Sequence, residues 1–227
     1  LSSAIKRYAD YYGVVTGQKN IFFTNNDTAY ESAIALNKKG IKVEAIIDIR
    51  ENPNSEFTKE ARSLGITIYK NHTIVDTHGY KKLNKISIME LSKDGQSFSN
   101  SNKIILDCDC LGMAGGWTPA VHLFTQSGGK LKFRDKDQVF IPNKYPSDQI
   151  SIGSCNGDFE LDEIINNASK SLKEFLDINE TNFDNLNIKC PKDKAIRNIW
   201  LLPSNKVLGK TKPFVDYQND ATAKDIK

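Results

Sequence analysis

The first fifty residues alternate between helical and continuously apolar patterns. Residues 1–13 repeat apolar side chains at helical spacing, and a glycine ends the repeat. The run NIFFT, residues 20–24, is short and continuously apolar, as a strand buried on both faces of a parallel sheet must be. A second helical pattern over residues 28–40 leads to a second such run, KVEAIIDI, at 42–49. This order predicts a β-α-β unit that follows a short lead-in helix.

The pattern between residues 50 and 117 changes to shorter periods. A helix is predicted from about Glu56 to Leu64, where Gly65 ends it. The residues that follow alternate apolar and polar side chains, which is typical of a small antiparallel meander, and SKDGQS is its turn. The run NKIILDCDCLGMAGGW then predicts one buried strand that ends in glycines. A β-α-β unit, a meander and a final strand together predict an α/β fold with right-handed crossovers.

Weaker patterns follow residue 118. A short helical or irregular piece precedes two strand fragments, KLKF and VFIP. QISIGSCNG is predicted as a short buried strand that ends in a glycine turn, and DFELDEIINNASKSLKEFL as an amphipathic helix. The segment 177–197 is rich in Asn and Lys and is typical of a linker.

Composition narrows the possible partners. Of 227 residues, 39% are hydrophobic and 26% charged, and 31 Lys and Arg against 28 Asp and Glu give a net charge of +3. This excess is too small and too scattered to indicate nucleic-acid binding. No apolar run approaches the roughly 18 residues that cross a bilayer, and no signal peptide is visible, so we expect no membrane association. Four cysteines without a secreted spacing predict free thiols in the cytoplasm.

The turn after the first apolar run lacks the glycines of a dinucleotide-binding loop. The fingerprint G-x-G-x-x-G/A lets the backbone approach a pyrophosphate at a helix N-terminus. Of the corresponding residues from Thr24 onward, Ala29 alone matches. Asp27 would place a carboxylate beside the phosphates, whereas Asn25 and Asn26 tolerate the backbone conformations of such a turn. The turn is therefore predicted to keep its geometry, with either Asp27 or Asn26 capping the helix.

Two further groups of residues invite a chemical interpretation. Asp48 ends the second apolar run, where a dinucleotide fold places the acid that binds ribose; the alternative is an aspartate that caps the next loop and pairs with Arg50. Cys108 and Cys110 lack the spacing and the additional ligands of a zinc site, so we interpret them as ordinary cysteines at a strand end. No nucleophile–base pair or carboxylate pair indicates a catalytic site.

Three separated strings resemble the α subunit of heterotetrameric sarcosine oxidases: FFTNNDTAYESAIAL, CDCLGMAGGWTPAVHLFTQSGGKL and FVDYQNDATAKDI. The resemblance runs from about Tyr8 to Ile226, although Met113 and Ala114 stand where the family usually has a serine. It implies that this sequence, which has no starting Met, is interior to a longer chain.

The resemblance implies a Rossmann-like dinucleotide-binding domain of the disulfide-reductase type with a small antiparallel meander, plus the C-terminal part of a neighbouring dinucleotide domain. Four parts are expected: a lead-in helix (1–16), an inserted domain with a degenerate fingerprint (17–127), the end of the first dinucleotide domain (128–178), and a linker with the start of a small domain (179–227).

The family resemblance places NAD on the neighbouring domain, at the glycine turn before the last long helix. There Gly153, Ser154 and Asn156 are the expected cofactor contacts, and the alternative for Asn156 is a helix cap. Further candidates for cofactor contact come from the degenerate domain; they are Asn25, Asn26, Asp48, Gly115, Gly116 and Trp117.

The same resemblance implies a complex with beta, gamma and delta subunits that also holds FAD, FMN and tetrahydrofolate. It would oxidise sarcosine to glycine, with the amine-oxidising flavin on the beta subunit. Asp216 and Gln218 stand where related subunits carry iron–sulfur cysteines, so no cluster is expected. The alternatives are a pyridine-nucleotide-dependent disulfide-reductase-like protein, an opine or amine dehydrogenase subunit, and an interaction module without a cofactor.

Overall fold

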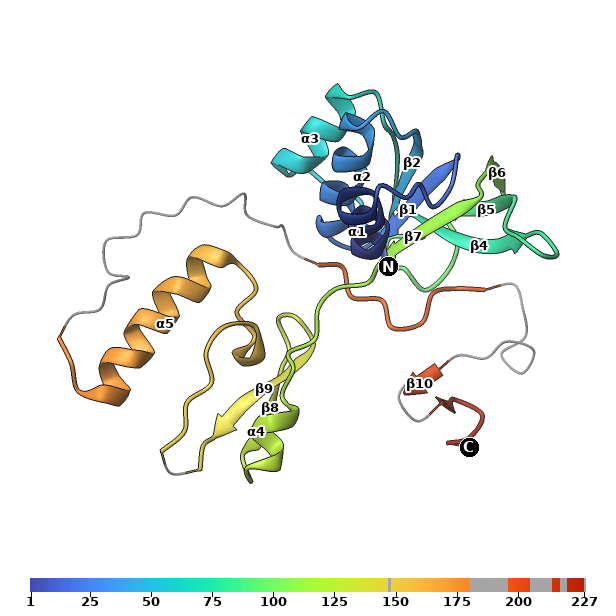
Figure 1. Ribbon diagram of the computed structural model, residues 1–227. Helices are drawn as coiled ribbons and strands as arrows, with labels where there is room; N and C mark the ends of the chain where they lie inside the picture. The colour runs from blue at the N-terminus through green and yellow to red at the C-terminus, as the bar shows by residue number, and fades with distance from the viewer. Residues whose placement is uncertain (147, 180–195, 205–213, 217–219, 227) are drawn as a thin grey trace.

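A four-stranded parallel sheet organises the first half of the protein (Figure 1). The computed structural model describes residues 1–146, 148–179, 196–204, 214–216 and 220–226. The sheet has the order β3-β2-β1-β7 and consists of β1 (Asn20–Thr24), β2 (Val43–Asp48), β3 (Thr67–Lys70) and β7 (Cys110–Ala114). Three helices pack along one face: α1 (Ser2–Tyr12), α2 (Thr28–Lys38) and α3 (Glu56–Ser63). The α/β, Rossmann-like fold is thus confirmed.

The central strand β1 is buried along its whole length because both faces of the sheet are covered. Phe22 points into the core on the helix side, where Tyr30 lies, whereas Ile21 and Phe23 point into the core on the opposite side. Successive side chains of a strand alternate between faces, so a strand covered on both faces needs an unbroken apolar run. This requirement explains the pattern NIFFT.

The second face carries an antiparallel meander of β4 (His72–His78), β5 (Lys85–Glu90) and β6 (Ile104–Asp107). The prediction of one long strand before the glycines is wrong, because that run divides into β6 in the meander and β7 in the parallel sheet. Asp109 redirects the chain between them. Its carboxylate accepts hydrogen bonds from the backbone N–H groups of Gln18 at 3.0 Å and Lys19 at 2.7 Å.

The second half of the chain is more open (Figure 1). Its elements are α4 (His122–Gln126), the hairpin of β8 (Lys130–Arg134) and β9 (Val139–Lys144), the 3₁₀ turn η1 (Gly153–Asn156), α5 (Leu161–Leu176), and the hairpin of β10 (Phe214–Asp216) and β11 (Ala221–Thr222). The strand predicted in QISIGSCNG is absent. Ile152 is extended, with φ −132° and ψ 144°, but no described residue supplies a neighbouring strand for it. Gln218 and most of the predicted linker lie outside the described residues.

The amphipathic helix predicted near residue 160 is present as α5, but its apolar side is open. Ser169 is its one buried residue, while Leu161 and Phe175 are 51% and 44% exposed. No helix in the described part of the chain is long and apolar enough to cross a membrane.

Candidate functional site

Side-chain hydrogen bonds close the turn between β1 and α2 without glycine. The hydroxyl of Thr24 donates to the carbonyl oxygen of Asn26 at 2.8 Å. The Oδ1 of Asn26 accepts from the backbone N–H and the hydroxyl of Thr28 at 2.9 and 2.6 Å, so Asn26 satisfies the first N–H of α2, whose N-cap residue is Asp27. Its Nδ2 donates to Oδ1 of Asn25 at 2.7 Å. The strand-turn-helix geometry is as predicted, and Ala29 is fully buried beside it.

A charged network lies buried beneath this turn. Arg50 Nη2 lies 2.5 Å from Asp27 Oδ1 and 2.8 Å from Asp48 Oδ2, and Tyr30 donates its hydroxyl to Asp48 Oδ2 at 2.8 Å. Asp48 also accepts from the backbone N–H of Arg50 at 2.9 Å. Asp48 is therefore the loop-capping aspartate of the alternative interpretation. Both oxygens of its buried carboxylate already accept hydrogen bonds from Arg50 or Tyr30, so Asp48 has no free position for a ribose hydroxyl.

Burial and charge shift the protonation of this network. Burial raises the pKa of Tyr30, and the charge of Asp48 adds to the effect, so Tyr30 stays a hydrogen-bond donor. For Arg50, burial alone would lower the pKa, but hydrogen bonds and charge from Asp48 and Asp27 outweigh it and raise the pKa above its ordinary value. Two acids thus face one base at the N-terminus of α2. This excess of acid is unfavourable for a pyrophosphate.

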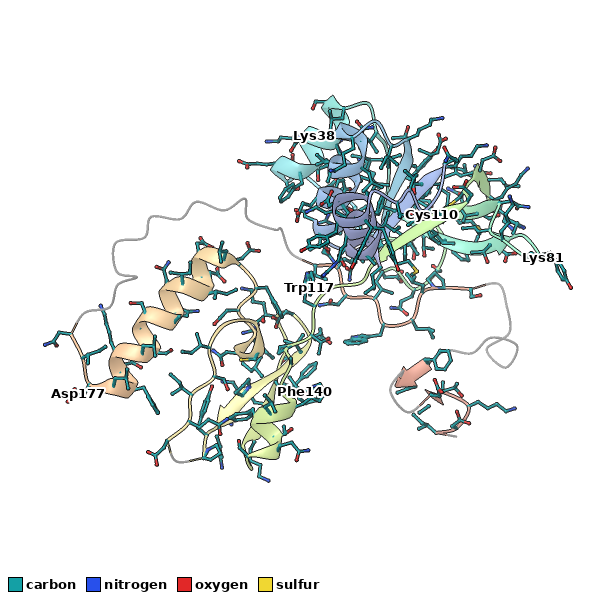
Figure 2. The ribbon with its side chains drawn as sticks, in the orientation of Figure 1. Lys38, Lys81, Cys110, Trp117, Phe140 and Asp177 are labelled. Carbon is teal, nitrogen blue, oxygen red and sulfur yellow. The ribbon has the colours of Figure 1, made fainter. Side chains whose placement is uncertain are left out.

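The predicted site residues that follow β1 and β7 lie around a small cavity. Asn25, Gly115, Gly116 and Trp117 line a space of about 150 Å³, together with residues 118, 137–139, 196 and 198–200. Figure 2 shows Trp117 where the chain leaves the parallel sheet for the second half. Asn26 and Asp48 do not line this cavity.

The segment 196–202 is the functional element that sequence reasoning missed, since residues up to 197 were interpreted as linker. Its Arg197 donates its backbone N–H to the carbonyl oxygen of Asn25 at 3.3 Å. In return, Nδ2 of Asn25 donates to the carbonyl oxygens of Arg197 at 3.3 Å and Gly115 at 3.2 Å. The apolar run IWLL at residues 199–202 is visible in the sequence and suggests a strand in NIWLLPSNK, but residues 196–204 form no strand in the structure.

The glycine turn at residues 153–157 forms a separate candidate site. Asn156 does not cap α5, whose N-cap residue is Glu160; its Oδ1 accepts from the hydroxyl of Tyr145 at 3.2 Å. Ser154 is exposed and Gly153 is buried with φ 77°. Asp158 follows the turn, and its buried Oδ2 has no hydrogen-bond partner within the described ranges. Asp158 is not among the site residues predicted from the sequence, although an acid after a glycine turn is visible in GSCNGD.

An unsatisfied carboxylate oxygen in this turn fits a ligand that brings a hydrogen-bond donor. Sugar hydroxyls are such donors, so the turn fits the ribose of a dinucleotide better than it fits a bare phosphate. Arg134 stabilises the turn by donating a hydrogen bond to the carbonyl oxygen of Gly157 at 2.7 Å. The same guanidinium also pairs with Asp137.

The two cysteines at the start of β7 differ in accessibility: Cys108 precedes the strand and Cys110 is its first residue. Cys108 is buried and donates to the carbonyl oxygen of Cys110 at 3.3 Å, and burial raises the pKa of its thiol to about 11. Cys110 is partly exposed. No group of three or more His, Cys, Asp or Glu residues in the described part of the chain is arranged to hold a metal ion.

Sequence similarity to curated proteins extends over the whole chain. The sarcosine oxidase alpha subunits of Corynebacterium sp. (strain P-1) and Rhizobium meliloti (strain 1021) are each 27% identical, and that of Corynebacterium sp. (strain U-96) is 24% identical. Each alignment covers 100% of this chain but only 22–24% of the relative. The chain therefore spans about a quarter of the length of these relatives. No protein-family model matches it.

Similarity to solved structures is weaker. Thioredoxin reductase of T. acidophilum aligns with a TM-score of 0.43 and 13% identity, over 68% of this chain and 51% of that one. L-proline dehydrogenase of P. horikoshii aligns with a TM-score of 0.40 and 17% identity, over 77% of this chain and 29% of that one. At these scores the fold assignment rests on the sheet topology described above.

Proposed function

We propose that this chain is part of an oxidoreductase subunit of the sarcosine oxidase alpha type, in which it forms a structural domain and one wall of a dinucleotide site. The observation that carries the proposal is the similarity to three such subunits over the full length of the chain. In the complete complex, which would include flavoprotein partners and a folate-linked step, sarcosine would be oxidised.

The dinucleotide, NAD in this proposal, belongs at the turn of residues 153–157 and not at the β1–α2 turn. Asp158 Oδ2 has a free acceptor position, and the amide of Asn156 lies in the same turn, so both can hold a ribose. NAD would supply hydride-transfer capacity or serve as a fixed structural group there. The chain's own contribution is to bind and orient it through Asp158 Oδ2 and the amide of Asn156.

The test uses the complete natural polypeptide and measures the dinucleotide that each variant retains. We expect Asp158→Ala and Asn156→Leu to weaken NAD binding, by about ten- to a hundredfold for Asp158, because a hydrogen bond to a charged acceptor is lost. The exposed Asn54 before α3 gives the matched control Asn54→Leu, which should retain NAD like the wild type. Chromatography of the released cofactor after gel filtration distinguishes NAD from FAD. Full NAD retention by Asp158→Ala, or release of FAD alone, would contradict the site assignment.

A second experiment tests the oxidoreductase assignment by measuring sarcosine-dependent release of peroxide. The complete polypeptide should copurify with a flavoprotein partner, and that complex should release peroxide when sarcosine is added. The 227-residue chain alone should not, since no complete flavin site is proposed in it. Peroxide production by the chain alone, after removal of every partner, would contradict the assignment of the chemistry to that partner.

A further inference from the structure

The carboxyl ends of β1, β2 and β7 form the crevice in which open α/β sheets bind their ligands. The sheet order β3-β2-β1-β7 places the topological switch point between β1 and β7. In dinucleotide-binding folds the pyrophosphate lies at the turn after the first strand, and the ribose lies beyond the end of the second. In this protein, residues 196–202, here called the strap, lie along that path.

The backbone of the strap is bonded at the switch point. Arg197 and Asn25 exchange hydrogen bonds in both directions, each at 3.3 Å, and the amide of Asn25 also reaches Gly115 after β7. These bonds occupy the turn that a pyrophosphate would approach.

The side chain of Arg197 continues to the ends of the next two strands. Its Nη1 donates to the carbonyl oxygen of Ile49, after β2, at 2.5 Å and to Oδ1 of Asn71, after β3, at 2.7 Å. Its Nη2 donates to the carbonyl oxygens of Ser92 at 3.3 Å and Lys93 at 2.8 Å, in the turn after β5. The guanidinium thus sits in a cage of four acceptor oxygens, here called the oxygen cage.

The oxygen cage explains why a cation fits this position and a nucleotide does not. Carbonyl and amide oxygens attract the five N–H donors of a guanidinium and repel the oxygens of a phosphate. Beneath the neighbouring turn, two acids, Asp27 and Asp48, face the single cation Arg50. Their excess negative charge also repels a phosphate. Both the acceptor oxygens of the oxygen cage and the excess of carboxylates disfavour binding of a ribose phosphate.

Apolar contacts hold the rest of the strap. Ile199 and Leu202 pack against the core between the parallel sheet and the meander. The turn after β5 approaches so closely that a Cβ on Gly95 would lie 2.6 Å from Ile199 Cδ1 and 3.2 Å from Arg197 Nη2. The strap is therefore packed into the domain as well as hydrogen-bonded to it.

We propose that the strap is a built-in replacement for the dinucleotide of the parallel-sheet domain, with Arg197 as the positioning residue that closes the crevice. The domain then keeps a dinucleotide-binding scaffold to hold the strap in a fixed place. This inference concerns the crevice alone and does not depend on what the turn at residues 153–157 binds.

Hydrogen exchange followed by mass spectrometry on the complete polypeptide tests the strap, with NAD and ADP as the added probes. In the wild type we expect slow exchange in peptides over residues 196–202, and no change in peptides over residues 24–30 when either nucleotide is added.

Arg197→Met should speed exchange of the strap by about ten- to a hundredfold, since charge-assisted hydrogen bonds are lost. Arg197→Lys should restore only part of the protection, because an ammonium cannot span the oxygen cage. Arg62, an exposed residue of α3, gives the matched control Arg62→Met, which should leave the strap unchanged.

Two results would overturn the proposal, and neither needs a variant. The first is strap exchange in the wild type as fast as in an unfolded peptide. The second is nucleotide-dependent slowing of exchange over residues 24–30, which would show that the crevice binds a nucleotide after all. Slowing confined to residues 153–157 would instead support the proposed function and leave the strap proposal standing, so the two proposals fail separately.

Discussion

The side chain of Asn26 accepts the hydrogen bond from a helix N-terminal N–H group that a bound phosphate would otherwise accept. The first backbone N–H groups of a helix have no partner within the helix and attract anions. Here the N–H of Thr28 already donates to Asn26 Oδ1 at 2.9 Å. The N-cap residue of the helix, Asp27, carries a charge of the wrong sign for a phosphate and is paired with Arg50. Single side chains therefore convert an anion-binding turn into a closed one.

Arg50 should be the most sensitive residue of the buried network. Arg50→Leu leaves Asp27 and Asp48 buried without their cation, and removing one partner of a buried ion pair costs about 3–5 kcal/mol. We expect a loss of this size in the free energy of unfolding, measured by urea denaturation. Arg62→Leu, on the exposed side of α3, should change it by less than about 0.5 kcal/mol. Equal effects of the two substitutions would mean that the network adds nothing to stability.

The elements that could be predicted are those whose sequence pattern is set by local burial. Both β1 and β2 are covered on two faces, which requires apolar runs that are readable without a structure. The division of one apolar run into β6 and β7 could not be read, because it depends on the contact of Asp109 with the residues before β1.

The strap could not be predicted for a related reason. Arg197 and Ile49 are 148 positions apart, and hydrogen bonds to backbone oxygens leave no trace in the types of the residues that accept them. The structure brings the candidate residues Asn25, Gly115, Gly116 and Trp117 together, because they follow the ends of the neighbouring strands β1 and β7. What fills the space between them was not visible in the sequence.

Close packing of β7 against β1 and α1 requires a glycine in the middle of β7. A Cβ on Gly112 would lie 2.7 Å from two ring carbons of Phe22 and 2.9 Å from Ile5 Cδ1. Gly112→Ala should therefore destabilise the protein by about 1–3 kcal/mol through overpacking, measured by urea denaturation. Gly115, beyond the end of the same strand, has no atom within 4 Å of the corresponding position. Gly115→Ala should be neutral or slightly stabilising, and a loss as large as that of Gly112→Ala would contradict the packing argument.

At the scale of the whole molecule, the two halves differ in how much apolar surface they bury. Both core clusters are built from residues of the parallel sheet, its helices and the meander, with the strap added at one edge. In the second half, Phe124, Val139 and Ile141 are the buried apolar residues among those described. The first half can therefore hold its fold by its own packing, whereas the second half has little core of its own.

This contrast is measurable by comparing two helices of the same chain. In α2, Ala29, Tyr30 and Leu36 are at most 1% exposed, whereas the 16 residues of α5 include a single buried one, Ser169. A helix of this length is marginal in water unless its apolar face is packed. In the 227-residue polypeptide we therefore expect amides of α5 to exchange within seconds and amides of α2 to be protected for far longer, as measured by hydrogen exchange. Equal protection of the two helices would mean that something covers the apolar side of α5 in solution. Sedimentation of the same sample would then distinguish a second copy of the chain from a rearranged monomer.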